Sequence, residues 1–473
     1  MVNGVSKTDR FIRYPFLSWL LIHAMFFALY VSIGFMLLHL GMIHPSLMFF
    51  SEKALLVLHG IPPRLENFGF IYPPLPILIA CLFNGNVLLA QGFVASLITT
   101  AIVFHIRKNT PTLRQAFPLT VFVTFSFPVL FLATQRFDLY LYFFLVVLSA
   151  KFLYQYKNEG YSLHLFLAGP LFGAAFFTHF SAIYLLPLFF FLIYYLYGGQ
   201  PKKMMAVSMT FFTPPLVSLF VFSYINLMFT GEAFGFLIKH NMLFSNLNIA
   251  ILISSGTVFE DLKYMLEYVL MIAPAIIPFF WGIFYDRNVV LILPFLIILS
   301  LFYSALFFPA IYFSAVFIIH FLLMTRWHEP FKQKAFLFVL GVSLLSSPVI
   351  ALSSSDSYEK GVAHAFFGSQ QEGNTDSYEK MAAFLNDTEG KILLDDVNGY
   401  PLVYLMGKPA RFILPYQFEF ATALSMPDRF VDYIVAWKDR SNDLIFQRFG
   451  PNSIERFQKL FEDKKVIIWR RIT

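Results

Sequence analysis

The stretch from Ser51 to Pro74 reads SEKALLVLHGIPPRLENFGFIYPP and lies between two strongly apolar runs. It carries four charged side chains and two Pro pairs, yet residues 55–58 are all apolar. These four residues predict a helical turn or two that lies along a membrane surface, and Tyr72-Pro73-Pro74 predicts an extended entry into the next apolar run. Loops of this size are mostly functional or disordered, and this one is too apolar to be disordered. We therefore expect residues 51–74, within a juxtamembrane outer loop at 44–74, to form the working surface.

The composition is that of a polytopic α-helical membrane protein. Hydrophobic residues make up 58% of the chain, charged residues only 13%, and there are 62 Phe. Apolar runs near the length needed to span a bilayer predict about eleven transmembrane helices. The expected spans are 16–42, 87–106, 116–133, 139–154, 163–177, 182–197, 207–229, 264–284, 289–308, 312–324 and 336–352. Residues 75–83 are too short to span and are expected in the interface, and a proline kink is expected at 214–215.

The charge distribution predicts a second, soluble part. Residues 1–354 hold 19 Lys and Arg and 11 Asp and Glu, whereas residues 355–473 hold 15 and 17. We therefore expect a membrane domain at 1–353 and a small α/β domain at 354–473 that begins with a polar linker at 353–376. Within the α/β domain the patterns predict strands at 391–394, 433–437 and 466–470, and helices at 378–385 and 454–461.

Positive charges predict the orientation. With the N-terminus in the cytoplasm, the inner side receives fourteen Lys and Arg and the outer side five. An odd number of spans then places the C-terminal domain outside the cytoplasm. We expect the protein in the cytoplasmic membrane, or in the endoplasmic reticulum if it is eukaryotic. The net charge of +6 arises from the membrane part, so it indicates topology and not nucleic-acid binding. Neither a Gly-rich phosphate loop nor a CxxC or HExxH motif occurs, so nucleotide and zinc chemistry lack support.

Acidic candidates lie on the predicted outer side. Asp138 follows Arg136 in QRFDLYLYFFLVVL, and an acid at a membrane boundary is costly enough to indicate function. The alternative is a local Arg–Asp pair that only caps the helix. Glu52 and Glu66 are the acids of the first outer loop, and either could be a general base or a metal ligand. The alternatives are a helix-start carboxylate for Glu52 and a solvated loop residue for Glu66.

Basic and polar candidates are consistent with a phosphate ligand. His179 lies between two predicted spans, and Lys239-His240-Asn241 lies in a second long outer loop. Charge-assisted hydrogen bonds to phosphate oxygens are strong, so basic side chains beside apolar helices suit a lipid-linked phosphate. Ordinary loop polarity is the alternative for each residue alone.

These features together resemble the GT-C superfamily of polytopic glycosyltransferases, and most closely its aminoarabinose–lipid A transferases and protein O-mannosyltransferases. The resemblance rests on the Gly60 to Leu75 segment, the QRFD motif, the break at Thr178-His179 and the loop GEAFGFLIKHN. It departs from the family at two points, because the nearest acid, Glu52, comes later than the family's acidic motif and His179 replaces a common Lys.

The resemblance implies inverting transfer of a sugar from a polyprenyl-phosphate-linked donor to an extracytoplasmic glycan, lipid or protein, in contact with membrane lipids and without nucleic acid. It implies catalytic acids among Asp138, Glu52 and Glu66. The ligands of the donor phosphate would be Arg64, Arg136, His179, Lys239 and His240. Tyr72 and Asn241 would line the substrate site. A divalent metal, Mg²⁺ or Mn²⁺, is a candidate cofactor, with Asp138 as a candidate ligand. A transporter or flippase of a lipid-linked glycan, or an inactive GT-C-like scaffold, is the alternative.

Overall fold

The computed structural model describes residues 15–237 apart from positions 71 and 111, residues 310–324, parts of 338–352, and residues 357–368 and 376–472 with gaps at 439–442, 452–453 and 463–464. The predicted spans at 264–284 and 289–308 lie outside these residues, and so do Lys239, His240 and Asn241.

Four described helices are long and apolar enough to cross a membrane, as expected for an integral membrane protein. They are α2 (Pro15–His39), α5 (Val87–Asn109), α8 (Phe137–Glu159) and α11 (Pro201–Thr230). Three shorter apolar helices accompany them: α9 (Ser162–Thr178), α10 (Ala182–Tyr197) and α16 (Ala310–Met324). The predicted break at Thr178-His179 is present between α9 and α10. Helix α11 continues through Pro214-Pro215.

The predicted span at 116–133 is not one straight helix. It consists of α6 (Leu113–Phe125) and α7 (Phe127–Gln135), which meet at Ser126 with a bend of 52°. Pro128 stands in the first turn of α7 and has no N–H with which to continue the hydrogen bonds of α6, so the chain changes direction there. Helix α7 is buried along its whole length.

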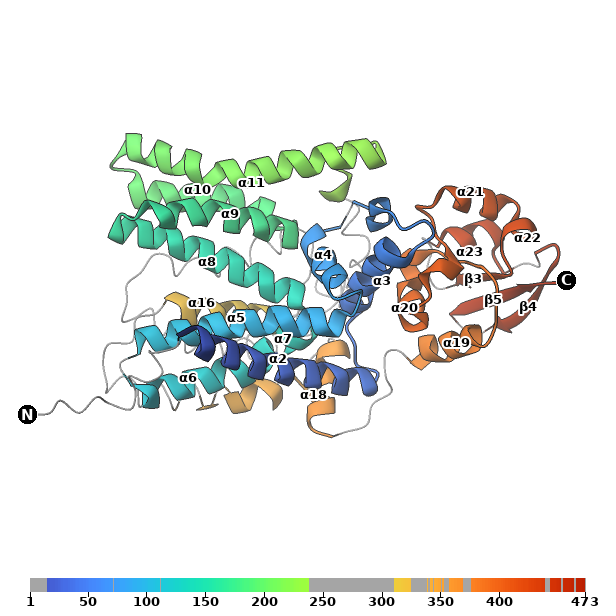
Figure 1. Ribbon diagram of the computed structural model, residues 1–473, viewed down its shortest axis with the longest axis horizontal. Coiled ribbons are helices and arrows are strands. Elements are labelled where there is room, and N and C mark those ends of the chain that lie inside the picture. Colours follow the sequence, from blue (N-terminus) through green and yellow to red (C-terminus); the bar gives the residue numbers. More distant parts are fainter. Residues whose placement is uncertain are drawn as a thin grey trace, which may run out of the picture.

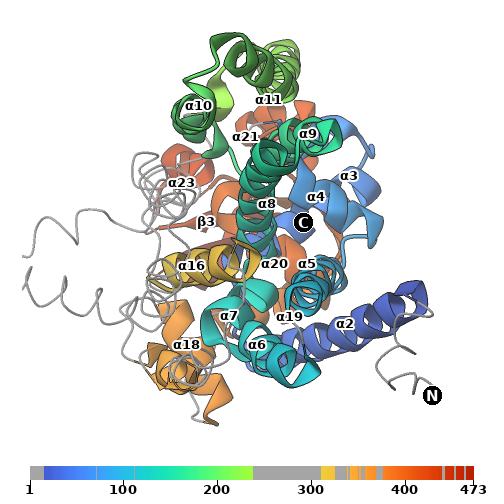
Figure 2. The same cartoon turned by 90° about the vertical axis from the view of Figure 1, so that its left-hand side faces the viewer.

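Helix α8 occupies the middle of the bundle. Figure 2 looks along the helices and shows α9 on one side of α8 and α5 and α16 on the other. In the most apolar 18-residue stretch of α8, 72% of the residues are buried, whereas in the corresponding stretches of α2 and α11 only 22% are. At the end of α8 far from the C-terminal sheet, Lys157 and Lys203 lie over the ring of Tyr197, at 4.9 and 5.4 Å from its centroid. Cations therefore gather at this end, the one that the charge count predicts to be cytoplasmic.

At the other end, residues 44–74 form a short helical layer between the bundle and the C-terminal sheet (Figure 1). This layer contains α3 (Pro45–His59), the 3-10 turn η1 (Leu65–Phe68) and then α4 (Pro74–Leu82). Helix α3 begins where it does because Pro45 occupies its first turn and the His44 ring accepts a hydrogen bond from the Ser46 N–H. The helix is thus much longer than the one or two turns predicted at 55–58.

Residues 376–472, here called the C-terminal unit, form a five-stranded mixed sheet with helices on both faces. The strands are β1 (Ile392–Leu393), β2 (Phe412–Ile413), β3 (Tyr433–Trp437), β4 (Phe457–Glu462) and β5 (Val466–Arg471), in the order β2-β1-β3-β5-β4. Strands β1, β2 and β3 are parallel, and β5 runs antiparallel to β3 and β4. The helices and turns are α19 (Asp376–Asn386), α20 (Asp396–Met406), η3 (Pro409–Arg411), α21 (Phe418–Ser425), α22 (Pro427–Phe430) and α23 (Leu444–Phe449).

Alternating strand residues face two separate apolar cores. One core joins the sheet to α19 and α20, and the other joins it to α21 and α23. Leu56 of α3 is fully buried in the first of these cores, so the layer next to the bundle and the C-terminal unit share packed side chains. Such a shared core holds α3 and α20 in fixed relation.

Two sequence interpretations of this region need correction or refinement. The helix predicted at 454–461 is wrong, because Phe457–Glu462 is the edge strand β4 paired with β5. Only Phe457 of this strand is buried, and the sequence FQKLFE does not alternate apolar and polar residues, so it gave no period-2 signal. Within the predicted linker, Ser357–Phe366 forms the helix α18, whose Phe366 ring packs on Phe127 of α7.

Candidate active site

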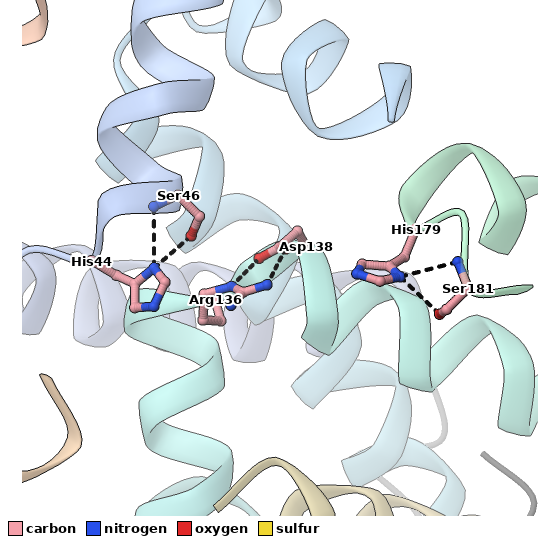
Figure 3. A network of polar contacts seen from close by, with 6 residues as sticks. All are labelled: His44, Ser46, Arg136, Asp138, His179 and Ser181. Carbon is pink, nitrogen blue, oxygen red and sulfur yellow. Dashed lines mark hydrogen bonds and ion pairs between the residues drawn. The ribbon is translucent and has the colours of Figure 1, made fainter. Parts of the chain in front are cut away.

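Three helix ends meet where the bundle faces the C-terminal unit. The start of α3, the start of α8 and the end of α9 bring His44, Arg136 and His179 to one region, and Figure 3 shows them in a row with Asp138 between Arg136 and His179. We call His44, Arg136 and His179 the basic cluster. Phe50 of α3 packs its ring on Phe137 of α8 at 5.8 Å between centroids, which fixes the two helices against each other.

Arg136 and Asp138 form a two-point ion pair. Arg136 Nε donates to Asp138 Oδ1 at 3.0 Å and Nη2 donates to Oδ2 at 2.8 Å, and both side chains are almost entirely buried. This fork geometry is the strong form of the Arg–carboxylate contact. Both carboxylate oxygens of Asp138 are therefore occupied by the guanidinium, which suits a residue that orients Arg136 better than one that accepts a proton.

The two histidines of the basic cluster are held in the same way. Each begins a His-x-Ser sequence, and in each the backbone N–H of the Ser donates to the ring Nδ1, at 3.1 Å for His44 and 3.3 Å for His179. The Ser hydroxyls also contact Nδ1, at 2.8 and 2.7 Å. An Nδ1 that accepts hydrogen bonds carries no proton, so in a neutral ring the proton is on Nε2. Burial, followed by the nearby charge of Arg136, lowers the pKa of His44 well below its usual value, so we assign it the neutral form.

Glu52 lies about two turns further along α3, roughly 12 Å from His44 along the helix axis. It is fully buried, and among the described residues neither of its oxygens has a hydrogen-bond partner. Its nearest cation is Lys53, whose Nζ lies 3.4 Å from Oε2, too long for a normal hydrogen bond. Burial raises the pKa of Glu52 to about 8, against the opposing charge of Lys53. A carboxyl with these properties can exchange a proton near neutral pH.

Lys53 is buried as well, and it joins α3 to the C-terminal unit. Its Nζ donates a short hydrogen bond to Asp396 Oδ2 on α20. It also lies 5.3, 5.7 and 5.1 Å from the ring centroids of Phe49, Tyr72 and Tyr416. Burial opposes the charged form, but Asp396 and then Glu52 outweigh it, so the pKa of Lys53 is raised. We call Glu52, Lys53 and Asp396 the ionic cluster.

The predicted site residues thus separate into groups. Tyr72 is brought to Glu52, because its ring packs on Phe49 at 4.5 Å and faces Lys53. Arg136, Asp138 and His179 come together around the start of α8. Arg64 lies elsewhere, exposed in the loop before η1 with its guanidinium over the Phe418 ring, so it is not part of the basic cluster. The backbone of Glu66 lies in η1, and its side chain is outside the described residues.

The sequence analysis did not single out His44, Lys53 or Asp396. A usable signal for Asp396 was the pair Asp395-Asp396 directly after the buried strand KILL, since polar groups at the carboxyl ends of parallel strands often serve a site. Lys53 could not be recognised in this way, because its partner is more than 340 residues away in the chain.

The candidate metal has no evident binding set among the described residues. No group of three or more His, Cys, Asp or Glu side chains in that part of the chain is arranged to hold an ion. Both oxygens of Asp138 already accept hydrogen bonds from Arg136. The described residues therefore offer no ligand set for Mg²⁺ or Mn²⁺, and the chemistry below uses side chains alone.

The raised pKa of Glu52 predicts a specific pH dependence of stability. Between the ordinary value of 4.5 and about 8 the folded protein holds a proton on Glu52 that the unfolded chain releases. The contribution of this group is therefore complete below pH 4.5 and is lost as pH rises through 8, at up to about 1.4 kcal/mol per pH unit. We expect the thermal midpoint of the detergent-solubilised protein to fall over this window by more in the wild type than in Glu52→Gln. Equal falls in both proteins would contradict the prediction.

Comparison with known proteins shows a solved structure with a similar fold over nearly the whole chain. No protein-family model and no curated protein sequence matches the chain. The structure is similar to that of the aminoarabinose transferase ArnT from Cupriavidus metallidurans bound to undecaprenyl phosphate, with a TM-score of 0.54 and 13% identity over 94% of this chain and 97% of that one. It is also similar, at a TM-score of 0.44 and 11% identity over 91% of this chain and 70% of the other, to the archaeal oligosaccharyltransferase AglB from Archaeoglobus fulgidus in complex with an inhibitory peptide and a dolichol-phosphate. That second score is too low to bear on the fold.

Proposed function

Because the chain has the GT-C fold, we propose that it is a membrane glycosyltransferase that moves a sugar from a polyprenyl-phosphate-linked donor to an extracytoplasmic acceptor. The observation that carries this proposal is the pairing of two unlike clusters on α3. A basic cluster suited to a phosphate lies at the start of the helix, and two turns later lies a buried carboxyl that accepts no hydrogen bond from any described residue.

The basic cluster is suited to hold the donor phosphate. The guanidinium of Arg136 supplies the charge, fixed in direction by Asp138. With Nδ1 of His44 and His179 accepting from the Ser residues, the proton of each neutral ring is on Nε2, and the Nε2–H of His44 can donate to a phosphate oxygen. Such donors stabilise the negative charge that develops on the phosphate as it leaves.

Glu52 is suited to act as the general base. In the proposed reaction the acceptor hydroxyl gives its proton to Glu52 as its oxygen attacks the anomeric carbon of the sugar. The bond from that carbon to the phosphate oxygen breaks, its electron pair stays with the polyprenyl phosphate, and the anomeric configuration inverts. A base with a pKa near the working pH combines sufficient ionisation with sufficient basicity.

The proposal includes the orientation of the protein in the membrane. We place the end of the bundle that carries the basic and ionic clusters outside the cytoplasm, because the cations around Tyr197 gather at the opposite end. The C-terminal unit then lies outside as well. The neighbouring structures do not favour the transporter alternative.

Binding of the lipid carrier tests the proposal without knowledge of the sugar. We expect the full-length protein in detergent to bind undecaprenyl phosphate, measured by native mass spectrometry, and to bind undecaprenol, which lacks the phosphate, at least tenfold more weakly. Transfer of a radiolabelled sugar from a polyprenyl-phosphate donor to an envelope extract is the second measurement. Equal binding of the phosphate and the alcohol, together with no transfer, would exclude this function.

A further inference from the structure

Two carboxylates compete for one buried ammonium in the ionic cluster. Lys53 Nζ makes a short hydrogen bond to Asp396 Oδ2, whereas Glu52 Oε2 remains 3.4 Å away. Glu52 and Lys53 are neighbours on α3, but Asp396 belongs to the C-terminal unit. The ammonium is therefore held more closely by the C-terminal unit than by the acid next to it.

The surroundings of Lys53 keep the ammonium in this place. The rings of Phe49, Tyr72 and Tyr416 approach it within 6 Å from three parts of the chain, and only 1% of Lys53 is exposed. In a buried site of low effective dielectric constant, charge–charge interactions are much stronger than in water. Whichever carboxylate holds the ammonium is kept ionised, and the other is left with the cost of burial.

Asp396 is itself fixed by the C-terminal unit. The preceding residue, Asp395, caps α20 by accepting from the Val397 N–H at 3.0 Å and also accepts from the Leu444 N–H at 2.8 Å. These contacts tie the start of α20 to α23. Asp395 thus anchors the helix end, while Asp396 reaches across to α3.

We propose that Asp396 is a positioning residue that acts on Glu52 through Lys53: by binding the ammonium, it withholds from Glu52 the cation that would keep it ionised. The proposal rests on the proposed function only in taking Glu52 as the base. It makes the C-terminal unit a determinant of the protonation of Glu52. The titratable groups facing Glu52 are Lys53 on α3, Asp396 on α20, and the phenols of Tyr72 and Tyr416, while Asp395, the N-cap of α20, faces Tyr72.

Removing the charge of Asp396 has two effects on Glu52, and both have the same sign. A negative charge that disfavours ionisation of Glu52 disappears, and Lys53 becomes available to pair with Glu52 alone. Both effects lower the pKa of Glu52. A purely structural role for Asp396 would instead reduce activity without changing the pH at which Glu52 titrates.

The test measures Glu52 directly. Dicyclohexylcarbodiimide is an apolar reagent that modifies protonated carboxyls, and peptide mass spectrometry locates the modified residue. In the full-length protein we expect the pH midpoint of Glu52 labelling to be lower in Asp396→Asn than in wild type. A decrease of one pH unit reduces labelling at the wild-type midpoint about fivefold. Asp396→Glu, which keeps the charge, is expected to have the wild-type midpoint. The control is Asp428→Asn, which removes an acid paired with the exposed Arg456, and it should leave the midpoint unchanged.

An unchanged or raised midpoint in Asp396→Asn overturns the inference. If that variant does not fold, Lys53→Met combined with Asp396→Asn removes both charges and leaves no unpaired partner. Because Asp396 already withholds the ammonium from Glu52 in the wild type, we expect this double variant to keep the labelling midpoint close to the wild-type value. A clearly higher midpoint would show that Lys53 keeps Glu52 ionised even with Asp396 present, and would overturn the inference. A shifted midpoint without any sugar transfer would instead refute the proposed function and leave the role of Asp396 intact.

Discussion

Replacing Glu52 by Gln is expected to reduce the rate of sugar transfer by about 10²–10⁴-fold, the usual contribution of a general base. Gln has the same shape and cannot accept the acceptor's proton. The substitution removes only the 3.4 Å ion pair between Glu52 and Lys53, and Lys53 keeps Asp396 as its hydrogen-bonding partner. The loss should therefore appear in kcat, with the KM for the donor little changed.

The pH profile provides the internal check on this result. Since the base must be ionised, wild-type activity should rise with pH and level off above about 8. The residual activity of Glu52→Gln should lack this rise. The control is Glu159→Gln, an exposed acid at the opposite end of α8, which should behave as wild type. A Glu52→Gln enzyme with wild-type kcat would remove Glu52 from the mechanism.

Local patterns in the sequence were sufficient to predict much of the helical part. Length and hydropathy located α5, α9 and α10 within three residues at each end and α8 within five, because each contains a long apolar run. The same criterion merged α6 and α7, since hydropathy does not report a change of direction. In the C-terminal unit, β3 and β5 were recognisable as buried runs rich in β-branched residues, whereas the exposed edge strand β4 has no such run.

The site was predictable only where it is local. Arg136 and Asp138 are two positions apart, and Glu52 belongs to the first outer loop, so each could be named from the sequence. The partner of Lys53 could not, because Asp396 comes from a different folding unit and the contact depends on how α20 packs on α3. Buried charges that are paired across units give no periodic signal in either segment.

Replacing Arg136 by Lys is expected to weaken donor binding by about 10–100-fold, corresponding to about 1.4–2.8 kcal/mol. Lys keeps the positive charge but cannot make two parallel hydrogen bonds to Asp138, so its ammonium is no longer held in a fixed direction. We expect the loss in the KM for the donor and in the affinity for undecaprenyl phosphate. The pH at which activity rises should not change.

The companion variant, Asp138→Asn, separates an orienting role from a catalytic one. Asn keeps one oxygen that can accept from Arg136, so the guanidinium retains part of its support. If Asp138 orients Arg136, this variant should weaken donor binding by less than Arg136→Lys and keep the wild-type pH profile. If Asp138 were the base, Asp138→Asn would reduce kcat as strongly as Glu52→Gln is expected to do. Because both oxygens of Asp138 face the guanidinium, whereas those of Glu52 have no hydrogen bond in the described structure, we expect the first result.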